Sequence, residues 1–277
     1  GGYCSLERTI AMAKKIKQEG FDFLLDFHYS DWWADPGQQR KPKAWENLHG
    51  TELEEAVYTY TKKVLCALKE AGAMPDMVQI GNEIRSGLLF PDGELPDYAS
   101  MVRLVNAGIR AAREIGGKEL LIMIHLDQGG RYFYLKDWFD RAFEAGLSDF
   151  DVIGLSYYPF WHGTFNDLKE TTKKLIQDFK KPIILAETAH AWRKSKNGFI
   201  DEARKRSQAL QHRHWDSAWC LIWTTQSWRL FLIKWEEEFT IGNHCAFRAA
   251  MKADGQKIWE YLMSAGRQWK QFIPLNL

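Results

Sequence analysis

Two glutamates of this sequence follow short apolar runs and could act as a catalytic pair. Glu83 comes after Asn82, directly behind the run Met77–Ile80, and Glu187 closes the run Ile183–Ala186. A glycosidic bond is cleaved by two opposed carboxyl groups, one that protonates the leaving oxygen and one that attacks the anomeric carbon. A single glutamate behind a strand can equally be a helix cap or an ion-pair residue. Two of them, in the contexts Asn-Glu and Leu-Ala-Glu-Thr, favour the catalytic interpretation.

Histidine and tryptophan side chains provide candidates for binding. His28 lies in the segment HYSDWW, where it could be a buried core histidine or part of a site. Trp32 and Trp33 could pack between strands and helices or form flat platforms for sugars. His212 and His214 resemble a metal-binding pair, but no third ligand has suitable spacing, and the four cysteines show no metal spacing either. The sequence therefore predicts no metal site.

The elements that must position these residues alternate between strand and helix. Short apolar runs are expected to be strands: Phe21–Phe27, Met77–Ile80, Leu120–Leu126, Val152–Leu155 and Ile183–Ala186. Stretches with helical periodicity lie before and between them: Leu6–Glu19, Glu52–Ala71, Tyr98–Ile115, Leu135–Ala145 and Phe165–Phe179. Repeated strand–helix–strand order predicts parallel strands joined by helical crossovers, as in a barrel or a doubly wound sheet.

The positions of the polar residues favour the barrel. Each apolar run ends in polar groups, which begin at His28, Asn82, His125, Ser156 and Glu187. Functional groups at the carboxyl ends of many successive strands are typical of a (β/α)₈ barrel, whereas a doubly wound sheet gathers them near one switch point. Neither a GxGxxG nor a GxxxxGK[ST] motif occurs, so no nucleotide cofactor is predicted.

Composition excludes several classes of protein. The chain has 277 residues, of which 45% are hydrophobic and 26% charged, and this usual globular balance excludes a disordered or fibrous protein. Its 37 basic and 36 acidic residues give a net charge of +1, which argues against a nucleic-acid partner. No apolar run approaches the roughly 20 residues that a membrane-spanning helix needs. The 13 tryptophans favour an aromatic-lined ligand groove.

Five longer blocks of the sequence resemble glycoside hydrolase family 53, the arabinogalactan endo-β-1,4-galactanases. In chain order they are LLDFHYSDWWADPGQQRKPKAW (Leu24–Trp45), VQIGNEIRSGLLFP (Val78–Pro91), IMIHLDQGG (Ile122–Gly130), GLSYYPFWHGT (Gly154–Thr164) and ILAETAHAW (Ile184–Trp192). The resemblance covers residues 1–203. It implies a (β/α)₈ TIM barrel that hydrolyses β-1,4-galactosidic bonds with retention, through two glutamates at the ends of the fourth and seventh strands.

The resemblance also implies roles for individual residues. Glu83 resembles the general acid/base, Glu187 the nucleophile, and Asn82 the residue that holds the sugar 2-hydroxyl. We expect the pKa of Glu83 to be raised, because it faces the ionised Glu187. Further substrate-binding residues are expected where the blocks match: His28, Trp33, Asp127, Tyr157 and Trp161.

The sequence departs from the family pattern in two places. Family members have two further βα units before the helix at Leu6, which supply the first two strands and an active-site Arg. Residues 204–277 diverge and lack the eighth-strand block with its Trp-Glu-Pro-type motif. We therefore expect residues 1–277 to be one catalytic domain that forms an incomplete barrel, with Trp219–Thr225 as a candidate last strand. The alternatives are an inactive, binding-only galactanase relative and a clan relative acting on another β-linked polysaccharide, such as mannan or xylan.

The resemblance also implies a substrate, an oligomeric state and a location. Galactan or arabinogalactan would be the substrate of a monomer that needs no cofactor, no nucleic acid and no membrane. No compact loop rich in Asp and Asn indicates calcium. Because the polymer cannot enter a cell, we expect extracellular or periplasmic localisation, with any export signal outside this sequence.

Overall fold

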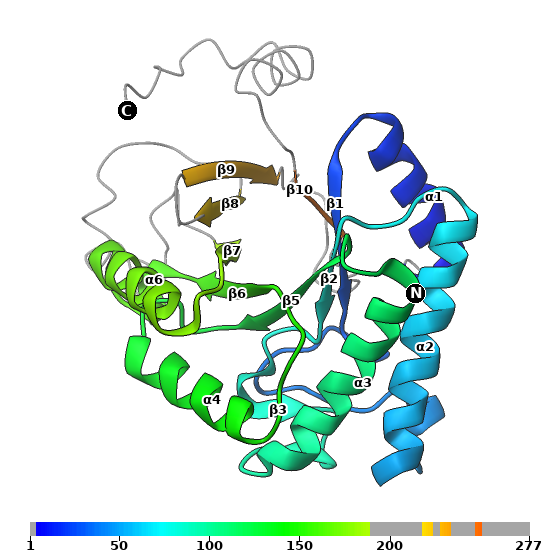
Figure 1. Cartoon of the computed structure of the whole chain (residues 1–277), viewed down its shortest axis with the longest axis horizontal. Coiled ribbons are helices and arrows are strands. Elements are labelled where there is room, and N and C mark those ends of the chain that lie inside the picture. The colour runs from blue at the N-terminus through cyan, green and yellow to red at the C-terminus, as the bar shows by residue number, and fades with distance from the viewer. Residues whose placement is uncertain (1–3, 189–217, 224–227, 234–246, 251–277) are drawn as a thin grey trace, which may run out of the picture.

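Eight strands form one curled sheet in the computed structural model, which describes residues 4–188, 218–223, 228–233 and 247–250. Five strands are parallel neighbours: β1 (Asp22–Phe27), β2 (Met77–Ile80), β5 (Leu121–Leu126), β6 (Val152–Tyr157) and β7 (Ile183–Thr188). The sheet continues in antiparallel direction with β8 (Ala218–Trp223) and β9 (Trp228–Ile233) beyond β7, and with β10 (Phe247–Ala250) beside β1. Seen end-on, the strands lie around a ring, with the helices outside it (Figure 1).

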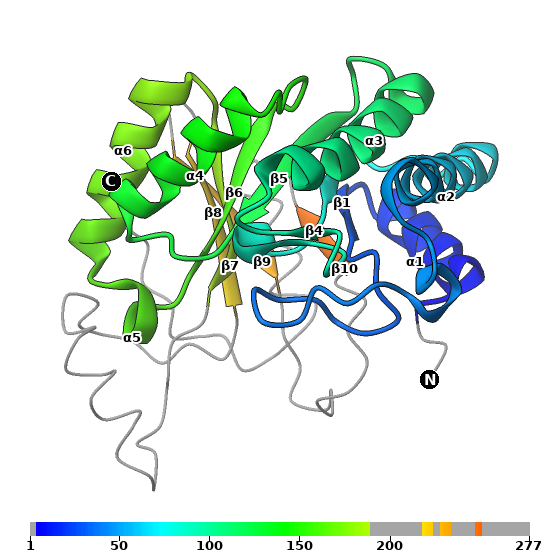
Figure 2. The same ribbon diagram turned by 90° about the horizontal axis from the view of Figure 1, so that it is seen from below.

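Helices connect the parallel strands and cover the outer face of the sheet (Figures 1 and 2). In chain order they are α1 (Leu6–Gln18), α2 (Gly50–Glu70), α3 (Tyr98–Gly116), α4 (Tyr132–Glu144), the short α5 (Pro159–His162) and α6 (Phe165–Phe179). Two 3₁₀ turns, η1 (Lys43–Trp45) and η2 (Ile84–Ser86), and a small hairpin of β3 (Gly87–Leu88) and β4 (Gly93–Glu94) lie in the connections. The five predicted strands and five predicted helices are confirmed, each within about three residues of its expected bounds.

Local sequence signals fix where three of the helices begin. The side chains of Ser5 and Asp97 accept backbone N–H groups at the starts of α1 and α3. Thr164 and Asp167 form a reciprocal capping box at the start of α6. These side chains satisfy backbone donors that the first turn of a helix leaves without a partner.

Both faces of the parallel strands are buried, because alternate residues point to opposite faces. The outer face packs against the helices in the main hydrophobic core, with members such as Phe23, Val78, Ile122, Ile153 and Leu185. The inner face forms a second cluster inside the curl of the sheet: Leu24, Met123, Val152, Ile184 and Ala186. Towards the carboxyl ends of the strands, the inward positions become polar, and there the candidate site lies.

The prediction of an incomplete (β/α)₈ barrel is confirmed by the five parallel strands with their crossover helices. The expected last strand, Trp219–Thr225, is present as Ala218–Trp223, but it runs antiparallel to β7, whereas the eighth strand of a regular barrel is parallel. Because β8 runs antiparallel to β7, it begins at the end of the sheet at which β7 stops. Most of the divergent region after Ala203 lies outside the described residues, as do His212 and His214, so a single domain over 1–277 stays a prediction.

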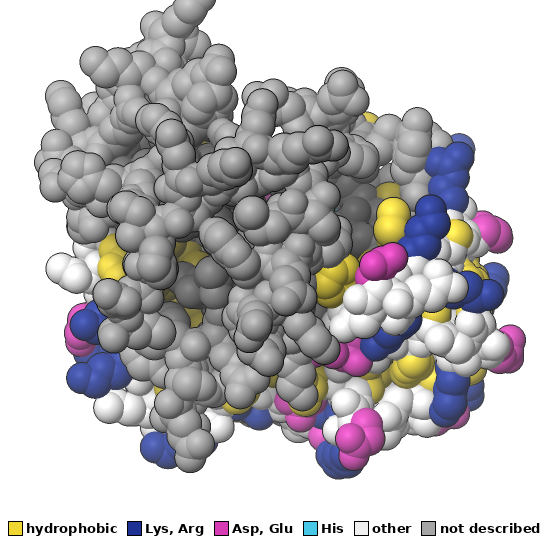
Figure 3. Space-filling model, turned by 90° about the horizontal axis from the view of Figure 1, so that it is seen from above, with side chains coloured by type: hydrophobic (Ala, Val, Ile, Leu, Met, Phe, Trp, Pro, Cys, Tyr) yellow, Lys and Arg dark blue, Asp and Glu magenta, His cyan; other side chains and the backbone are white. Residues whose placement is uncertain are grey.

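The described surface carries mixed charge. On the face seen in Figure 3, basic and acidic side chains are interspersed over the described residues. Among the helices that the structure describes, none combines the length and the apolar character needed to cross a membrane.

Candidate active site

Glu83 lies in a tight turn at the carboxyl end of β2. Gly81 and Glu83 both have a left-handed backbone, with φ of 80° and 48°. Residues other than glycine adopt this conformation only where their surroundings enforce it. Here the neighbours Asn82 and Ile84 are buried on either side of the partly buried Glu83. A Cβ at Gly81 would lie 2.5 Å from Ile84 Cγ2, so the turn depends on glycine at that position.

Glu187 is placed by a β-bulge in β7. Leu155 of β6 pairs with Leu185, but the next residue, Ser156, pairs with Glu187, so Ala186 is an extra residue on β7. Regular alternation would send Glu187 to the outer face together with Leu185. A bulge adds one residue and re-aims the side chain that follows it. The bulge therefore turns the Glu187 carboxyl group into the barrel.

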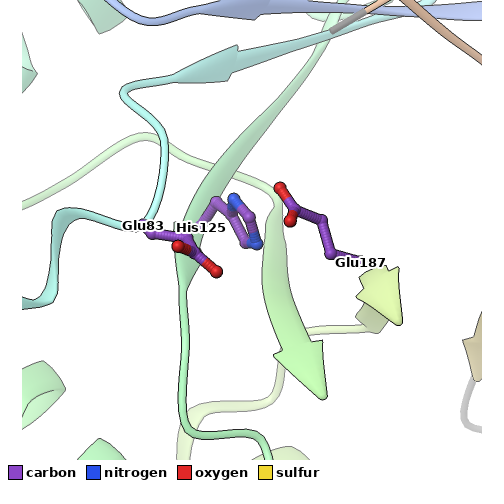
Figure 4. Close-up of side chains that lie close together, drawn as sticks. All are labelled: Glu83, His125 and Glu187. Carbon is purple, nitrogen blue, oxygen red and sulfur yellow. The ribbon is translucent and has the colours of Figure 1, made fainter. Parts of the chain in front are cut away.

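The two glutamates meet around His125. One carboxyl oxygen of Glu83, one of Glu187 and a ring nitrogen of His125 all lie within 4.8 Å of one another. Figure 4 shows the three side chains pointing toward a common centre, with His125 between the two carboxyl groups. The structure thus brings together the two residues that the sequence analysis singled out for catalysis, Glu83 after β2 and Glu187 in β7, with His125 of β5 beside them.

His125 is fixed by hydrogen bonds at both ring nitrogens. It is fully buried, with Nδ1 3.0 Å from Asn82 Oδ1 and Nε2 2.9 Å from Ser156 Oγ. Because Asn82 Oδ1 can only accept, Nδ1 carries the hydrogen, and in the neutral ring Nε2 accepts the Ser156 hydroxyl. A metal ion would need one of these nitrogens as a lone-pair donor, so binding it would break an existing hydrogen bond. The three residues therefore suit acid–base chemistry better than metal binding.

Asn82 has one amide hydrogen left to offer. Its Oδ1 also accepts from Gln79 Nε2 at 3.0 Å, and its Nδ2 donates to the backbone oxygen of Ala34 at 2.8 Å. An amide nitrogen has two hydrogens, so one N–H of Asn82 is not used by these bonds. The fixed orientation of the side chain suits donation to a ligand hydroxyl.

A belt of polar side chains continues to the first parallel strand. Asp26 accepts from Gln79 Nε2 at 2.7 Å and pairs with His28 Nε2 at 3.2 Å, and His28 Nδ1 accepts the backbone N–H of Ala34 at 2.9 Å. With Asn82, His125 and Ser156, this belt spans β1 to β6 around the inside of the sheet. Such networks fix the rotamers of their members, because a buried polar group without a partner is costly.

Two aromatic residues lie next to Glu187. The hydroxyl of Tyr158 donates to Glu187 Oε2 at 2.8 Å. The Tyr158 ring packs edge-on against Trp161 and against His162, with ring centroids 5.6 Å apart in both pairs. Trp161 is 53% exposed. Burial lowers the pKa of His162.

Contacts with other residues of the fold are seen for two of three further residues that were expected to bind substrate. Tyr157 points into the outer core, and its hydroxyl donates to the backbone oxygen of Gly163 at 3.0 Å. Asp127 is buried and accepts from Arg85 Nε at 2.7 Å, and Trp33 is partly buried behind β1. None of these contacts tests a role in substrate binding, which stays a prediction for all three residues.

Sequence reasoning missed Tyr158 and His125 as members of this group. Both were visible as polar residues at the ends of predicted strands. The available signal was the alternation along each strand: Met123 and His125 share one face of β5, and Ser156 and Tyr158 share one face at the end of β6. Which of these faces points inward became apparent only from the curl of the sheet.

Comparison with known proteins adds independent evidence. The sequence model of Glycosyl hydrolase family 53 matches residues 1–218. The arabinogalactan endo-β-1,4-galactanase of Cellvibrio japonicus is 36% identical over 199 residues, covering 69% of this chain and 52% of that protein. The endo-β-1,4-galactanase of Bacillus subtilis is 35% identical over 216 residues, covering 76% and 48%. A protein of Niallia circulans, described as uncharacterized, is 48% identical over 200 residues, covering 69% and 54%.

Solved structures agree. The GH53 catalytic domain of Ignisphaera aggregans superposes with a TM-score of 0.69 at 43% identity, covering 77% of this chain and 59% of that one. A fungal β-1,4-galactanase superposes with a TM-score of 0.61 at 35% identity, covering 65% and 55%. The chain spans about half the length of the curated relatives it matches.

Proposed function

Because the chain belongs to glycosyl hydrolase family 53, we propose that it hydrolyses β-1,4-galactosidic bonds within galactan or arabinogalactan, with retention of anomeric configuration. The observation that supports this most directly is the approach of Glu83 and Glu187 oxygens to within 4.8 Å. Retaining glycosidases hold their carboxyl groups about 5–5.5 Å apart, whereas inverting enzymes need about 6.5–9.5 Å to admit a water molecule. The short separation favours direct attack by a carboxylate.

The reaction divides into two displacements. In the first, a Glu187 oxygen forms a bond to the anomeric carbon, the bond to the leaving oxygen breaks, and Glu83 gives its proton to that oxygen. In the second, Glu83 removes a proton from water, the water oxygen attacks the anomeric carbon, and Glu187 is released as a carboxylate. The protein ends in its starting protonation state, so no cofactor is required.

The hydrogen bond from Tyr158 supports this division of roles. A hydroxyl donor 2.8 Å from Glu187 Oε2 favours the ionised carboxylate that a nucleophile must be. The bond is made to Oε2, one of the two carboxyl oxygens of Glu187. The assignment of Glu83 as acid/base also agrees with the family pattern. The five parallel strands β1, β2, β5, β6 and β7 would correspond to the third to seventh strands of the barrel, so that Glu83 follows the fourth strand and Glu187 ends the seventh.

Residues around the pair would hold the sugar. The remaining N–H of Asn82 can donate to the 2-hydroxyl, an interaction that strengthens in the transition state. Trp161, half-exposed beside Tyr158, would stack against an apolar sugar face. His28, tied to Asp26, would border the same sugar from the β1 side.

The proposed substrate follows from two relatives named galactanases. Because a polymeric substrate cannot enter the cell, we also propose that the enzyme acts outside the cell or in the periplasm. A monomer is sufficient for the proposed site, because all the residues above come from one chain. The localisation part is tested by fractionating cells of the source organism and locating the chain with an antibody.

The function is tested by incubating the chain with β-1,4-galactan and following the products by ¹H NMR, with Glu187→Ala as the matched control. We expect the β-anomer to appear first and the α-anomer only later, through mutarotation, and no product from the control. An α-anomer that appears first would contradict retention. Galactan that is bound but not cleaved, or a preference for mannan or xylan, would contradict the proposed activity.

A further inference from the structure

Asp26 is a carboxylate inside the polar belt to which the proposed mechanism gives no role. It shares the inner face of β1 with Leu24 and pairs in register with Gln79 of β2. Its side chain is 0% exposed. Oδ1 accepts from Gln79 Nε2 at 2.7 Å, and Oδ2 lies 3.2 Å from His28 Nε2. Burial of a carboxylate costs free energy unless its oxygens are hydrogen-bonded, and here both oxygens have a partner.

The two bonds of Asp26 begin two branches that meet at Asn82. The first branch runs through Gln79, whose Nε2 also donates to Asn82 Oδ1 at 3.0 Å. The second runs through His28, whose Nδ1 accepts the backbone N–H of Ala34 at 2.9 Å, and the backbone oxygen of Ala34 accepts from Asn82 Nδ2 at 2.8 Å. The five residues therefore form a closed ring of hydrogen bonds.

The backbone of Ala34 fixes the direction of every bond in this ring. A backbone N–H can only donate, so His28 Nδ1 is an acceptor and the bond to Asp26 uses a hydrogen on His28 Nε2. A backbone oxygen can only accept, so Asn82 turns Nδ2 toward Ala34 and Oδ1 toward Gln79. Gln79 must then offer its amide nitrogen. Both branches thus bring a donor to Asp26, and a carboxylate, unlike an amide of the same shape, accepts at both oxygens.

Gln79 gives both hydrogens of its amide to the ring. One goes to Asp26 and the other to Asn82, whereas the amide oxygen of Gln79 is buried without a hydrogen-bond partner among the described residues. A buried acceptor without a partner lowers stability, and such an arrangement in a native fold needs a reason. Gln39 Nε2 donates to the backbone oxygen of Asn82 at 2.8 Å, so the main chain there is held independently of the ring. What the ring adds is the orientation of the Asn82 side-chain amide.

We infer that Asp26 is a positioning residue: by accepting hydrogen bonds at both oxygens, it holds the Asn82 amide in the orientation that presents its remaining N–H to the 2-hydroxyl of the sugar. The inference rests on the proposed function, because it takes that hydroxyl as the partner of Asn82. Since its own side chain is 0% exposed, Asp26 acts through Gln79 on one side and through His28 and Ala34 on the other.

Asp26→Asn keeps the shape of the side chain but leaves one acceptor in place of two. If the new amide accepts from His28, its NH₂ group meets the amide hydrogens of Gln79, and if it accepts from Gln79, its NH₂ group meets the Nε2 hydrogen of His28. Turning the Gln79 amide would set its oxygen against Asn82 Oδ1, and moving the His28 hydrogen to Nδ1 would set it against the N–H of Ala34. One branch must therefore open, and the Asn82 amide loses its support on that side.

The test compares two substrates in the full chain. One is 4-nitrophenyl β-1,4-galactobioside, and the other is its analogue that lacks the 2-hydroxyl on the galactose bearing the nitrophenyl group. In Asp26→Asn we expect the ratio of kcat/KM for the first to kcat/KM for the second to fall about 10–100-fold below the wild-type ratio, because a misplacement of about 1 Å can cost about 10²-fold in rate. Gln79→Met opens the first branch and should lower the same ratio.

Asp151→Asn is the matched control. Asp151 also accepts from two donors, Arg113 Nη2 and the backbone N–H of Ile122, but it precedes β6 at the opposite end of the sheet. We expect this control to keep the wild-type ratio.

The ratio distinguishes positioning from a purely structural role, which would lower kcat/KM for both substrates equally. An unchanged ratio in folded Asp26→Asn, or an equal fall of the ratio in Asp151→Asn, would overturn the inference and leave the proposed function intact. If circular dichroism shows that Asp26→Asn does not fold, Gln79→Met decides: a lower ratio supports the inference, and an unchanged ratio overturns it.

A measurement without catalysis separates this inference from the proposed function, which fails if the wild type cleaves neither substrate. His125 Nδ1 lies 3.0 Å from Asn82 Oδ1, so the tautomer of His125 reports the orientation of the Asn82 amide. Its ¹⁵N NMR signals are identified by their loss in His125→Phe. We expect the hydrogen on Nδ1 in the wild type and a shift of part of the population to Nε2 in Asp26→Asn. A hydrogen on Nε2 in the wild type, or the same tautomer populations in both proteins, would show that Asp26 does not orient Asn82.

Discussion

The hydroxyl of Tyr158 donates a hydrogen bond to the proposed nucleophile, Glu187, and Tyr158→Phe removes that hydroxyl alone. The bond to Glu187 Oε2 is 2.8 Å long, and a hydrogen bond to a charged group contributes about 1.5–3 kcal/mol. If the bond positions Glu187 for attack, its loss lowers kcat/KM for galactan by about 10–150-fold. The edge-on contacts of the ring with Trp161 and His162 persist in phenylalanine, so the fold should not change.

The assay is the initial rate of reducing-sugar release from β-1,4-galactan, with Tyr157→Phe as the matched control. Tyr157 also loses one hydroxyl, but that hydroxyl donates to Gly163 in the outer core. We expect the control to lose about 0.5–1.5 kcal/mol of unfolding free energy and to keep its kcat. If Tyr157 also binds substrate, as the resemblance implies, its variant raises KM while kcat is kept.

A double-mutant cycle with Glu187→Ala completes the test. Because both groups act through one bond, Tyr158→Phe should lower the free energy of unfolding less in the Glu187→Ala background than in the wild type. A fall of less than about threefold in Tyr158→Phe, or equal falls in the two tyrosine variants, would refute the reasoning that this bond positions the nucleophile.

Three further predictions concern the framework of the site. His125→Phe leaves the fully buried Ser156 hydroxyl without its His125 partner. We therefore expect a loss of about 1–3 kcal/mol of unfolding free energy, measured by urea denaturation. An unchanged midpoint of unfolding would contradict this expectation. Gly130→Ala places a Cβ 1.9 Å from the backbone oxygen of His162, and this clash must displace the segment that bears Trp161. We therefore expect both the melting temperature and the rate of galactan cleavage to fall. Wild-type values for both would contradict this packing. Burial lowers the pKa of His162 in the folded protein, whereas the unfolded chain takes up the proton near pH 6.5. Stability should therefore decrease as the pH falls through about 6.5. Between pH 7.5 and 5.5 the wild type should lose more unfolding free energy than His162→Gln, and equal losses would contradict the assignment.

Much of this molecule follows from short-range patterns in its sequence. The apolar runs and the amphipathic stretches predict the strands and helices to within about three residues, because burial on one or both faces imposes period 2 or period 3.6 on the residues involved. Glu83 and Glu187 could be paired from sequence because parallel strands bring their carboxyl ends to one face of a barrel. The composition alone argued against a disordered or fibrous protein and against a nucleic-acid partner.

The tertiary structure decided which of several neighbouring polar residues belong to the site. Tyr157 and Tyr158 are adjacent in sequence, yet one lies in the outer core and the other contacts Glu187, because the side of a strand that faces inward depends on how the whole sheet curls. Glu187 itself faces inward only because the bulge at Ala186 shifts its register against β6. The antiparallel direction of β8 likewise depends on pairing with β7.

The sequence by itself therefore determined the elements, their order and the two carboxylates, since these depend on residues close together in the chain. Only the tertiary structure decided that His125 lies between the carboxylates and that Asn82 keeps one N–H for a ligand. Each of these features joins residues from different strands and helices. Their contacts depend on register, twist and side-chain packing, which no local pattern encodes.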